Sequence, residues 1–563
     1  MISYRKLAMR VLGHSPVSAV KTARRSTGKR AAALALTAAL VVGMTLPAFA
    51  QDWYIEDGDI SISAGENGNN VTQGSTTKEN DTDTVIKSKD SSTASSNTVT
   101  IDADEGKTVN VTLDNVTINV DEGYKYGYDS NAYKTAVSVT GSGNTNIELN
   151  GNNTLKSGYG HAGLEHNKTD DSGTLTLQDE KNDDGSAKGS ASDTTGSLTA
   201  TGGYHSAGIG GSDKQDGQAT ITGGEITATG GNGAAGIGGG AGDTDAVGGD
   251  GDVTISGGTI TATGGSLGAG IGGGAYGNGT VTVTDGDITA KATDNYGAGI
   301  GGGFGAIPKD TLIGGNGTVT ISGGTITEAS GGYMAAGIGS GYQGLGTVTI
   351  EGDAVIKNAQ GGEAGAGIGS GTYGDSNILI RGNAVIENAE SSANGAGIGS
   401  GQGDLYLDGD GMVIDPTVGN VTIEGNAKIE NAKSGYGGSG IGGGAIGIGN
   451  VIIRGNAQIG NATGGEEGAG IGGGALGTGD VTIEGNVTIE NAQGGAGAAG
   501  IGGGAETEPD TEDTRNKISI KSTEAGSPNI TAAGGGVLNN EDAPLAGAAA
   551  IGSGSVADGA TEV

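Results

Sequence analysis

Short apolar segments recur along residues 201–505 with a two-residue alternation and no helical period. One repeat contains Val253-Thr254-Ile255, then an alternating segment at 259–263, then Ala-Gly-Ile-Gly at 269–272. Alternation places Val and Ile on one face of a strand and Thr on the other. Three short strands in a repeat of about 30 residues predict one coil of a parallel β-helix.

The spacing of these segments shows where the coils vary. The separation between the end of the Val-Thr-Ile segment and the Ile of Ala-Gly-Ile-Gly hardly changes, as from Ile255 to Ile271 and from Ile483 to Ile501. The connection from that Ile to the next Val-Thr-Ile end is short in six coils and about twice as long at 398–423. Every long insertion therefore falls in one connection, which we expect to be one corner of the coil.

We therefore predict an all-β fold, a right-handed, single-stranded parallel β-helix of about 12 coils of about 30 residues. Residues 51–200 have longer alternating strands and form N-terminal coils, and residues 201–505 form the regular glycine-rich array. Residues 506–563 form irregular C-terminal coils without a clear polar cap, as expected for either a truncated chain or a freely secreted protein.

Glycine accounts for 123 of the 563 residues, about three times its average usage of ~7%. We expect the glycines around Ala-Gly-Ile-Gly to permit positive φ and close backbone approach at tight corners. The segment 268–273 matches G-x-G-x-x-G, but the motif recurs in most coils without a following helix, which excludes a dinucleotide site. One register holds asparagine in five coils, which predicts a ladder of side-chain amides: Asn358, Asn388, Asn431, Asn461 and Asn491.

The first 50 residues differ from the rest. Eight Lys and Arg precede an apolar run that ends in Ala48-Phe49-Ala50, which indicates a secretory signal peptide at 1–50, cleaved near Ala50-Gln51. The run is too short for a spanning helix. We expect the mature protein to be secreted or displayed on a bacterial cell surface.

Removal of those residues leaves 21 basic against 64 acidic residues, a formal charge of −43. Such a surface repels phosphate backbones and anionic membranes, so neither nucleic acid nor membrane insertion is expected. The chain has no cysteine, so packing rather than disulfides must hold it. We expect a monomer.

Aromatic residues recur in two registers and offer flat faces to sugar rings; covering the glycine-rich backbone is the alternative role. The corner with insertions carries Tyr276, Phe304, Tyr342, Tyr373 and Tyr406. A second line lies just before Ala-Gly-Ile-Gly: Tyr159, Tyr204, Tyr296, Tyr333 and Tyr436. The cluster Tyr124, Tyr126, Tyr128 and Tyr133 is a third candidate. We predict carbohydrate contacts along these positions.

Two insertions contain clustered carboxylates, which suit a hard cation such as Ca²⁺. They are Asp243, Asp245, Asp250 and Asp252 in one loop, and Asp404, Asp408 and Asp410 in another. Neither matches an EF-hand loop, and solvated acidic loops are the alternative. No other cofactor is expected.

The chain resembles a family of secreted clostridial and gut-bacterial β-helix proteins. The matching stretches are "VTLDNVTINV" at 111–120, "TAVSVTGSGNTNIELNGNNTLKSG" at 135–158 and the array around 251–274. The resemblance implies a pectate-lyase-like solenoid, carbohydrate binding associated with cellulose and polygalacturonate, and bound Ca²⁺. It covers the N-terminal coils and the array, and it rests on pattern rather than on a site motif.

We therefore expect a non-catalytic polysaccharide-binding or adhesion solenoid whose partner is an extracellular plant or host glycan. A catalytic group of carboxylates with a positioned base is not evident, so a polysaccharide lyase or hydrolase is the less favoured alternative. A structural surface stalk or protein adhesin without a glycan ligand is the other. Ice binding is disfavoured because the Thr-x-Thr faces fade after the fifth coil.

Overall fold

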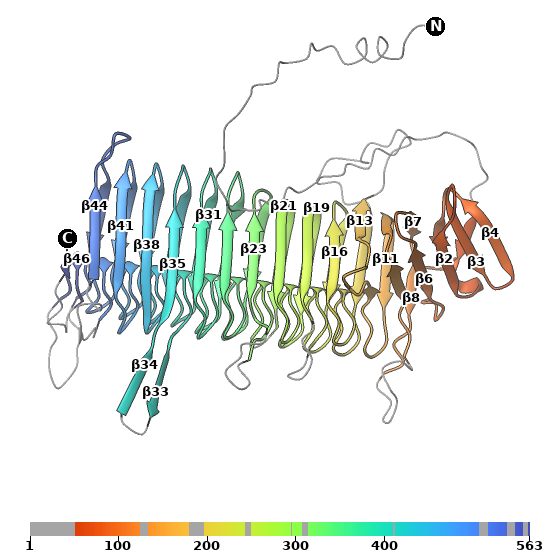
Figure 1. Cartoon of the computed structure of the whole chain (residues 1–563), viewed down its shortest axis with the longest axis horizontal. Coiled ribbons are helices and arrows are strands. Elements are labelled where there is room, and N and C mark those ends of the chain that lie inside the picture. Colours follow the sequence, from red (N-terminus) through yellow and green to blue (C-terminus); the bar gives the residue numbers. More distant parts are fainter. Residues whose placement is uncertain are drawn as a thin grey trace, which may run out of the picture. The chain divides into compact units, whose positions relative to one another are not determined.

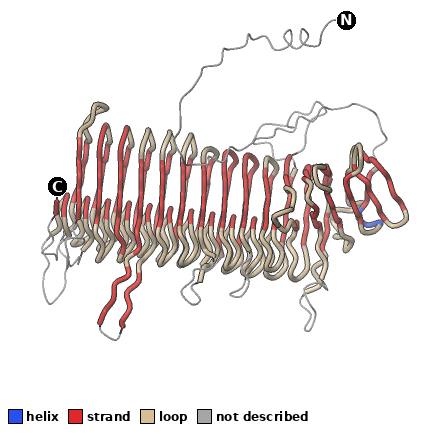
Figure 2. Tube along the Cα trace, in the orientation of Figure 1, coloured by secondary structure: helices blue, strands red, loops and turns tan. Residues whose placement is uncertain are grey.

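The computed structural model describes residues 51–562 except 124–132, 180–195, 243–248, 294–295, 307–313, 409–410, 506–515, 537–546 and 555–560. The predicted signal peptide therefore lies outside the described residues. From residue 51 on, the chain winds into a stack of coils, and neighbouring coils pair through parallel strands (Figures 1 and 2). The predicted parallel β-helix is confirmed. Among the described residues no helix is long and apolar enough to cross a membrane.

Three ladders of strands run through the stack. The Val-Thr-Ile segments form the first ladder: β1 (Asp52–Tyr54), β5 (Val85–Lys87), β7 (Thr108–Asp114), β10 (Asn144–Asn150), β13 (Leu175–Asp179), β16 (Gly217–Ile221), β23 (Gly317–Ile321), β26 (Gly346–Ile350), β30 (Ser376–Ile380), β35 (Thr417–Ile423), β38 (Gly447–Gly455), β41 (Gly479–Gly485), β44 (Asn516–Lys521) and β47 (Thr561–Glu562). β19 (Gly251–Gly264) and β21 (Gly279–Ala292) are long enough to contribute to both this ladder and the second.

The second ladder follows a bend in each coil. Its strands are β8 (Thr117–Asn119), β11 (Asn152–Lys156), β14 (Ser197–Thr201), β17 (Glu225–Thr229), β24 (Thr325–Ser330), β27 (Val355–Ile356), β28 (Ala359–Gly361), β31 (Val385–Ser391), β36 (Lys428–Ser434), β39 (Gln458–Thr463), β42 (Thr488–Gln493) and β45 (Asn529–Ala533). The pairing is in register, so equivalent residues of successive coils stack, as in Ile429 on Ile459.

The third ladder contains the Ala-Gly-Ile-Gly segments. Its strands are β2 (Ile60–Ala64), β6 (Val99–Ala103), β9 (Val137–Gly141), β12 (Leu164–Glu165), β15 (Ile209–Gly210), β18 (Ile237–Gly238), β20 (Ile271–Gly272), β22 (Ile300–Gly301), β25 (Ile338–Gly339), β29 (Ile368–Gly369), β32 (Ile398–Gly399), β37 (Ile441–Gly442), β40 (Ile471–Gly472), β43 (Ile501–Gly502) and β46 (Ile551–Gly552). In the array each strand consists of only the Ile and the Gly that follows it, because the chain turns away on both sides of the buried Ile.

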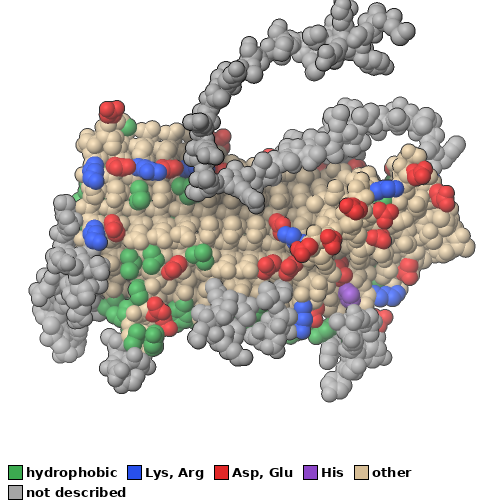
Figure 3. Space-filling model, viewed as in Figure 1, with side chains coloured by type: hydrophobic (Ala, Val, Ile, Leu, Met, Phe, Trp, Pro, Cys, Tyr) green, Lys and Arg blue, Asp and Glu red, His purple; other side chains and the backbone are tan. Residues whose placement is uncertain are grey.

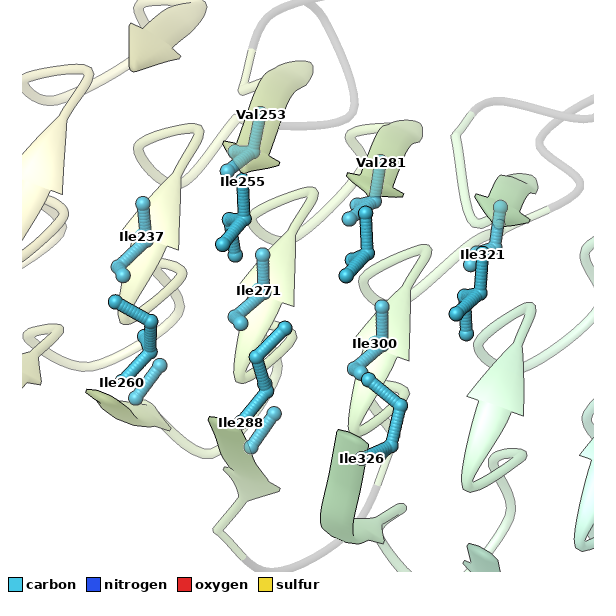
Figure 4. Close-up of a cluster of buried hydrophobic side chains, with 14 of the residues drawn as sticks. Ile237, Val253, Ile255, Ile260, Ile271, Val281, Ile288, Ile300, Ile321 and Ile326 are labelled. Carbon is cyan, nitrogen blue, oxygen red and sulfur yellow. The ribbon is translucent and has the colours of Figure 1, made fainter. Parts of the chain in front are cut away.

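The core is a stack of Val and Ile side chains that point inward from the three ladders (Figure 4). Ile237, Ile271 and Ile300 pair in sequence and are fully buried. Ile260 and Ile288 pair from the second ladder and face the same interior. Each coil covers its neighbour's apolar face, so the coils stabilise one another rather than folding singly.

The N-terminal end has a cap that the alternating pattern did not reveal. β3 (Asn69–Gln73) and β4 (Thr76–Asp81) add to β2 in antiparallel order, after a single 3₁₀ turn at Ile55–Asp57. The indole of buried Trp53 donates a hydrogen bond to Asp81 at 3.0 Å. The cap covers a sheet edge that would otherwise be open to another chain.

One connection leaves the coil as a separate hairpin. β33 (Asp404–Asp408) and β34 (Gly411–Asp415) pair only with each other and project from the stack between β32 and β35 (Figure 1). This hairpin lies in the longest connection, 398–423. The fold therefore departs from the repeat at the corner where the sequence predicts insertions.

Candidate functional site

Five aromatic rings from four consecutive coils form one contact cluster, here named the central aromatic cluster. Its members are Tyr276, Tyr296, Phe304, Tyr342 and Tyr373. The ring centroids of Phe304 and Tyr342 are 5.7 Å apart and nearly parallel, and Tyr276 meets Phe304 edge-on at 5.2 Å. Tyr342 also contacts Tyr296 at 5.5 Å and Tyr373 at 5.7 Å. The rings thus form a continuous aromatic surface along the stack.

The structure merges the two aromatic lines that the sequence kept apart. Tyr296 precedes a third-ladder strand and Phe304 follows it, yet their rings lie 5.1 Å apart. The reason is the very short strand between them: the chain bends back so tightly that Ala298 N donates to the carbonyl of Gly302 at 2.9 Å. Between coils, Tyr342 N donates to the Tyr296 carbonyl at 3.1 Å. The aromatic residues that precede and that follow the third-ladder strand therefore lie on one surface.

Two of the cluster tyrosines have a backbone conformation that normally favours glycine. The fifth residue after the buried Ile has positive φ in every coil of the array that has the shortest connection. These residues are Lys214 (+63°), Tyr276 (+60°), Gln343 (+59°), Tyr373 (+61°), Ile446 (+58°) and Leu476 (+58°). The left-handed conformation costs an L-residue about 1–2 kcal/mol. None of these six residues is glycine in a chain that is otherwise rich in it, so their side chains are present at a cost in stability.

A second group of rings lies toward the N-terminus, and we name it the N-terminal tyrosine stack. Tyr159 and Tyr204 stack at 5.4 Å with an interplanar angle of 12°, and Tyr133 contacts Tyr159 at 5.4 Å. Tyr204 is 47% exposed. A hollow of about 600 Å³ lies beside Tyr159 and Tyr204, and Asp121 lines it. Tyr124, Tyr126 and Tyr128 lie outside the described residues.

The remaining predicted aromatics stand apart from the central aromatic cluster. Tyr333 and Tyr436 are exposed, and the Tyr333 hydroxyl donates to Glu363, which raises the Tyr333 pKa. Tyr406 lies on the hairpin strand β33 and is 47% exposed. The hairpin also exposes Leu405 and Ile414, and Figure 3 shows hydrophobic side chains gathered on this part of the face.

A pocket of about 400 Å³ lies between the base of the hairpin and the end of the central aromatic cluster, and we name it the hairpin pocket. Tyr373 and Leu345 form its apolar wall, while Asp375, Asp404 and Asp415 supply carboxylates. Burial and the neighbouring Asp404 carboxylate, which accepts a hydrogen bond from the phenol, raise the pKa of Tyr373. The pocket therefore combines an exposed ring with negative charge.

The predicted metal ligands divide into described and undescribed residues. Asp243, Asp245 and Asp410 lie outside the described residues, as does the side chain of Asp408. Asp250 accepts hydrogen bonds from Asn278, and Asp252 pairs with Lys168 at 2.6 Å. Within the described residues no group of three or more His, Asp or Glu is arranged to hold a metal ion. Asp404 belongs to the hairpin pocket.

A polar hollow of about 710 Å³ lies over the first ladder, beside the segment 168–174. Asp216 and Asp250 line it, and burial followed by the charge of Asp250 raises the pKa of Asp216. Lys168, the cation that lines it among the described residues, is held by Asp252. A raised carboxyl pKa is a property of many acid–base catalysts, so this hollow is where a catalytic function would have to be tested.

Hydrogen-bonded ladders occupy other surface registers. The predicted ladder is confirmed in part: Asn431, Asn461 and Asn491 donate to the preceding amide at 3.0–3.4 Å. A parallel ladder through Asn383, Asn426, Asn456 and Asn486 was missed, although the repeated "GN" of these coils could have revealed it. Arg381 and Arg454 pair with Glu351 and Glu424 of the preceding coils, as their charge pattern suggests. These registers are structural.

Comparison with known proteins agrees with this architecture. A family model described as a beta helix repeat matches residues 196–213, 220–241, 253–275 and 319–342. No curated protein and no solved structure matches the chain. The matched segments contain strands of all three ladders, including Ile209, Ile237 and Ile271. The chain is a parallel β-helix whose coils are similar to beta helix repeats.

Proposed function

We propose that this solenoid binds polysaccharide without cleaving it, outside the cell or on its surface. The observation that carries the proposal is the central aromatic cluster. Five rings from four consecutive coils form one partly exposed surface on a chain that has only 18 aromatic residues in 563.

Aromatic faces suit a sugar chain because pyranose rings present flat, apolar C–H surfaces flanked by hydroxyl groups. Tyrosine offers an apolar body with a polar tip, so it can contact both. Coils repeat at about 4.8 Å along the stack, so the rings follow the axis as the units of a linear polymer would. Asp375 and Asp404 beside the rings can accept hydrogen bonds from hydroxyl groups.

The first 50 residues and the charge of the chain support the proposed location. A basic region, an apolar run and Ala-Phe-Ala precede the first coil, as in a secretory signal peptide. The strongly acidic mature chain suits an extracellular glycan better than nucleic acid or an anionic membrane. We propose a secreted or surface-displayed monomer. Chelation with EDTA tests whether its binding needs Ca²⁺.

Cleavage of polysaccharide is the second candidate, and the polar hollow with Asp216 favours testing it. A lyase needs a base that is available to abstract a proton. Lys168 is paired with Asp252 in the described structure. A purely structural stalk or protein adhesin is the third candidate.

The test is a pull-down of residues 51–563 on insoluble cellulose and on calcium-pectate gel, with and without EDTA. We expect retention on cellulose without release of soluble sugar, and loss of retention in the variant Tyr342→Ala,Tyr373→Ala. Tyr54→Ala, which removes a partly exposed ring outside the cluster and outside both predicted aromatic lines, is the matched control and should be retained. Sugar release, abolished by Asp216→Asn, would instead establish an enzyme. No retention on any glycan would favour the stalk.

A further inference from the structure

The hairpin pocket differs from the rest of the central aromatic cluster in its charge. Asp375, Asp404 and Asp415 line it, and no Lys or Arg does so among the described residues. In the hollow beside the N-terminal tyrosine stack, by contrast, Asp121 is paired with Lys156 at 2.9 Å. The hairpin pocket therefore keeps a local negative charge that the other aromatic hollow has neutralised.

The Tyr373 ring at this pocket is held by contacts on two sides. Tyr373 has φ +61° and 37% of its surface exposed, and its hydroxyl donates to Asp404. The rings of Tyr373 and Tyr342 contact each other at 5.7 Å in a T-shaped arrangement. Tyr373 is thus fixed between a carboxylate and a second ring while part of it remains open to the pocket. Carboxylates beside an aromatic face are the groups that recognise an ammonium ion.

We propose that the hairpin pocket selects polysaccharides that carry free amines, with the ammonium group held between Tyr373 and Asp404 and the following sugars on the central aromatic cluster. This inference rests on the proposed function and names its ligand class. It departs from the polygalacturonate association that the family resemblance implies, because a polyuronate would bring carboxylates toward Asp375, Asp404 and Asp415.

The aromatic surface next to the pocket favours a glycan over a lysine-rich protein as the ligand. From Tyr373 the aromatic surface continues through Tyr342, Phe304 and Tyr276 over four coils. Flat surfaces at regular spacing match a polymer of flat rings, whereas an extended peptide would need backbone partners. The hairpin strands β33 and β34 are the unpaired edges nearest the pocket, but they project from the coil rather than along the cluster.

The experiment measures by calorimetry how two soluble oligosaccharides bind to residues 51–563: glucosamine hexamer, whose amines are free, and its N-acetylated form, whose amines are blocked and uncharged. We expect the amine form to bind about tenfold more tightly at low salt, and the preference to shrink at high salt. Asp404→Asn and Asp415→Asn should each remove the preference. Asp404→Asn keeps an acceptor for Tyr373, and Asp287→Asn is the control because it removes an exposed charge outside the pocket.

The outcomes separate this inference from the proposed function. Equal binding of both oligosaccharides, or tighter binding of the acetylated one, would overturn amine selection and leave polysaccharide binding intact. Binding of neither, together with no retention on insoluble glycans, would overturn the proposed function itself. Equal binding of polylysine, lost in Asp404→Asn, would assign the pocket to basic proteins and overturn the glycan assignment.

Discussion

At the scale of single residues, glycine and its absence are both informative. Gly369 has φ +139°, and an added Cβ would collide with the carbonyl oxygen of Gly399 in the next coil. Gly74 also has positive φ (+58°), but nothing lies within 4 Å of its Cβ position. The first glycine is required by conformation and by stacking, the second by conformation alone.

Substitution of these two glycines should separate the two requirements. Gly74→Ala should lower the free energy of unfolding by about 1 kcal/mol, the cost of the left-handed conformation. Gly369→Ala should lower it by at least ~3 kcal/mol, because the coils must also move apart. Urea unfolding followed by circular dichroism measures both. Equal losses would mean that the stack tolerates a methyl group there.

At the corner residues that have positive φ, substitution by glycine should leave stability nearly unchanged. Leu476→Gly should change stability by less than ~1 kcal/mol, because relief of strain offsets lost packing. Tyr373→Gly should be similarly stable and yet bind glycan at least tenfold more weakly. Unfolding and retention assays on the same preparations test this. A large loss of stability in Tyr373→Gly would show that the ring serves packing alone.

His166 gives the fold a dependence on pH. Burial lowers its pKa, although its ring nitrogen donates a 3.1 Å hydrogen bond to the Gln218 carbonyl. The unfolded His takes up a proton near pH 6.5, and the folded one resists protonation. The stability that comes from keeping the buried ring neutral is therefore complete above about pH 6.5. It is lost as pH falls from there through the lowered pKa. His166→Gln should therefore lose less stability than wild type between pH 7.5 and 5.5.

At the scale of elements, the sequence predicted the strands well and their meeting points poorly. Alternating Val, Thr and Ile are local, so the registers of Ile237 on Ile271 and of Ala228 on Ala262 follow from repeat length alone. The contact between Tyr296 and Phe304 could not be predicted. It depends on how sharply the short strand bends back, which no alternation encodes. The β3–β4 cap was not predicted because the parallel strands of this stack have one face in water and therefore alternate as antiparallel strands do.

The hairpin β33–β34 should be separable from the coil that bears it. Its strands pair only with each other, and the next coil closes directly from Ile441 to Ile453 without any such insertion. Replacing residues 402–416 by a minimal connection should leave stability within ~1 kcal/mol of wild type, since loop length contributes weakly. Amine selection should disappear while retention on cellulose persists. An unfolded product would show that the hairpin supports the coil.

At the scale of the whole described stack, each coil contacts its neighbours through equivalent residues. Ile453 and Ile483 occupy the same register, so removal of residues 454–483 would join two chain ends that follow the same path. Such a variant should fold with unchanged far-ultraviolet circular dichroism per residue and somewhat lower stability. It should bind glycan normally, because the central aromatic cluster lies in other coils. Loss of folding would mean that this coil makes a contact beyond its neighbours.

The N-terminal cap has a consequence for how the chain finds its register. Coils this alike could pair one repeat out of step, with a whole turn looped out, and still bury their Ile side chains. Among the described residues, the antiparallel β2–β3–β4 unit and the Trp53 hydrogen bond to Asp81 occur once. They mark a single place from which winding can begin. In the secretion proposed above, this end of the chain would leave the membrane first, so the cap would fix the register before any of the similar coils could pair out of step.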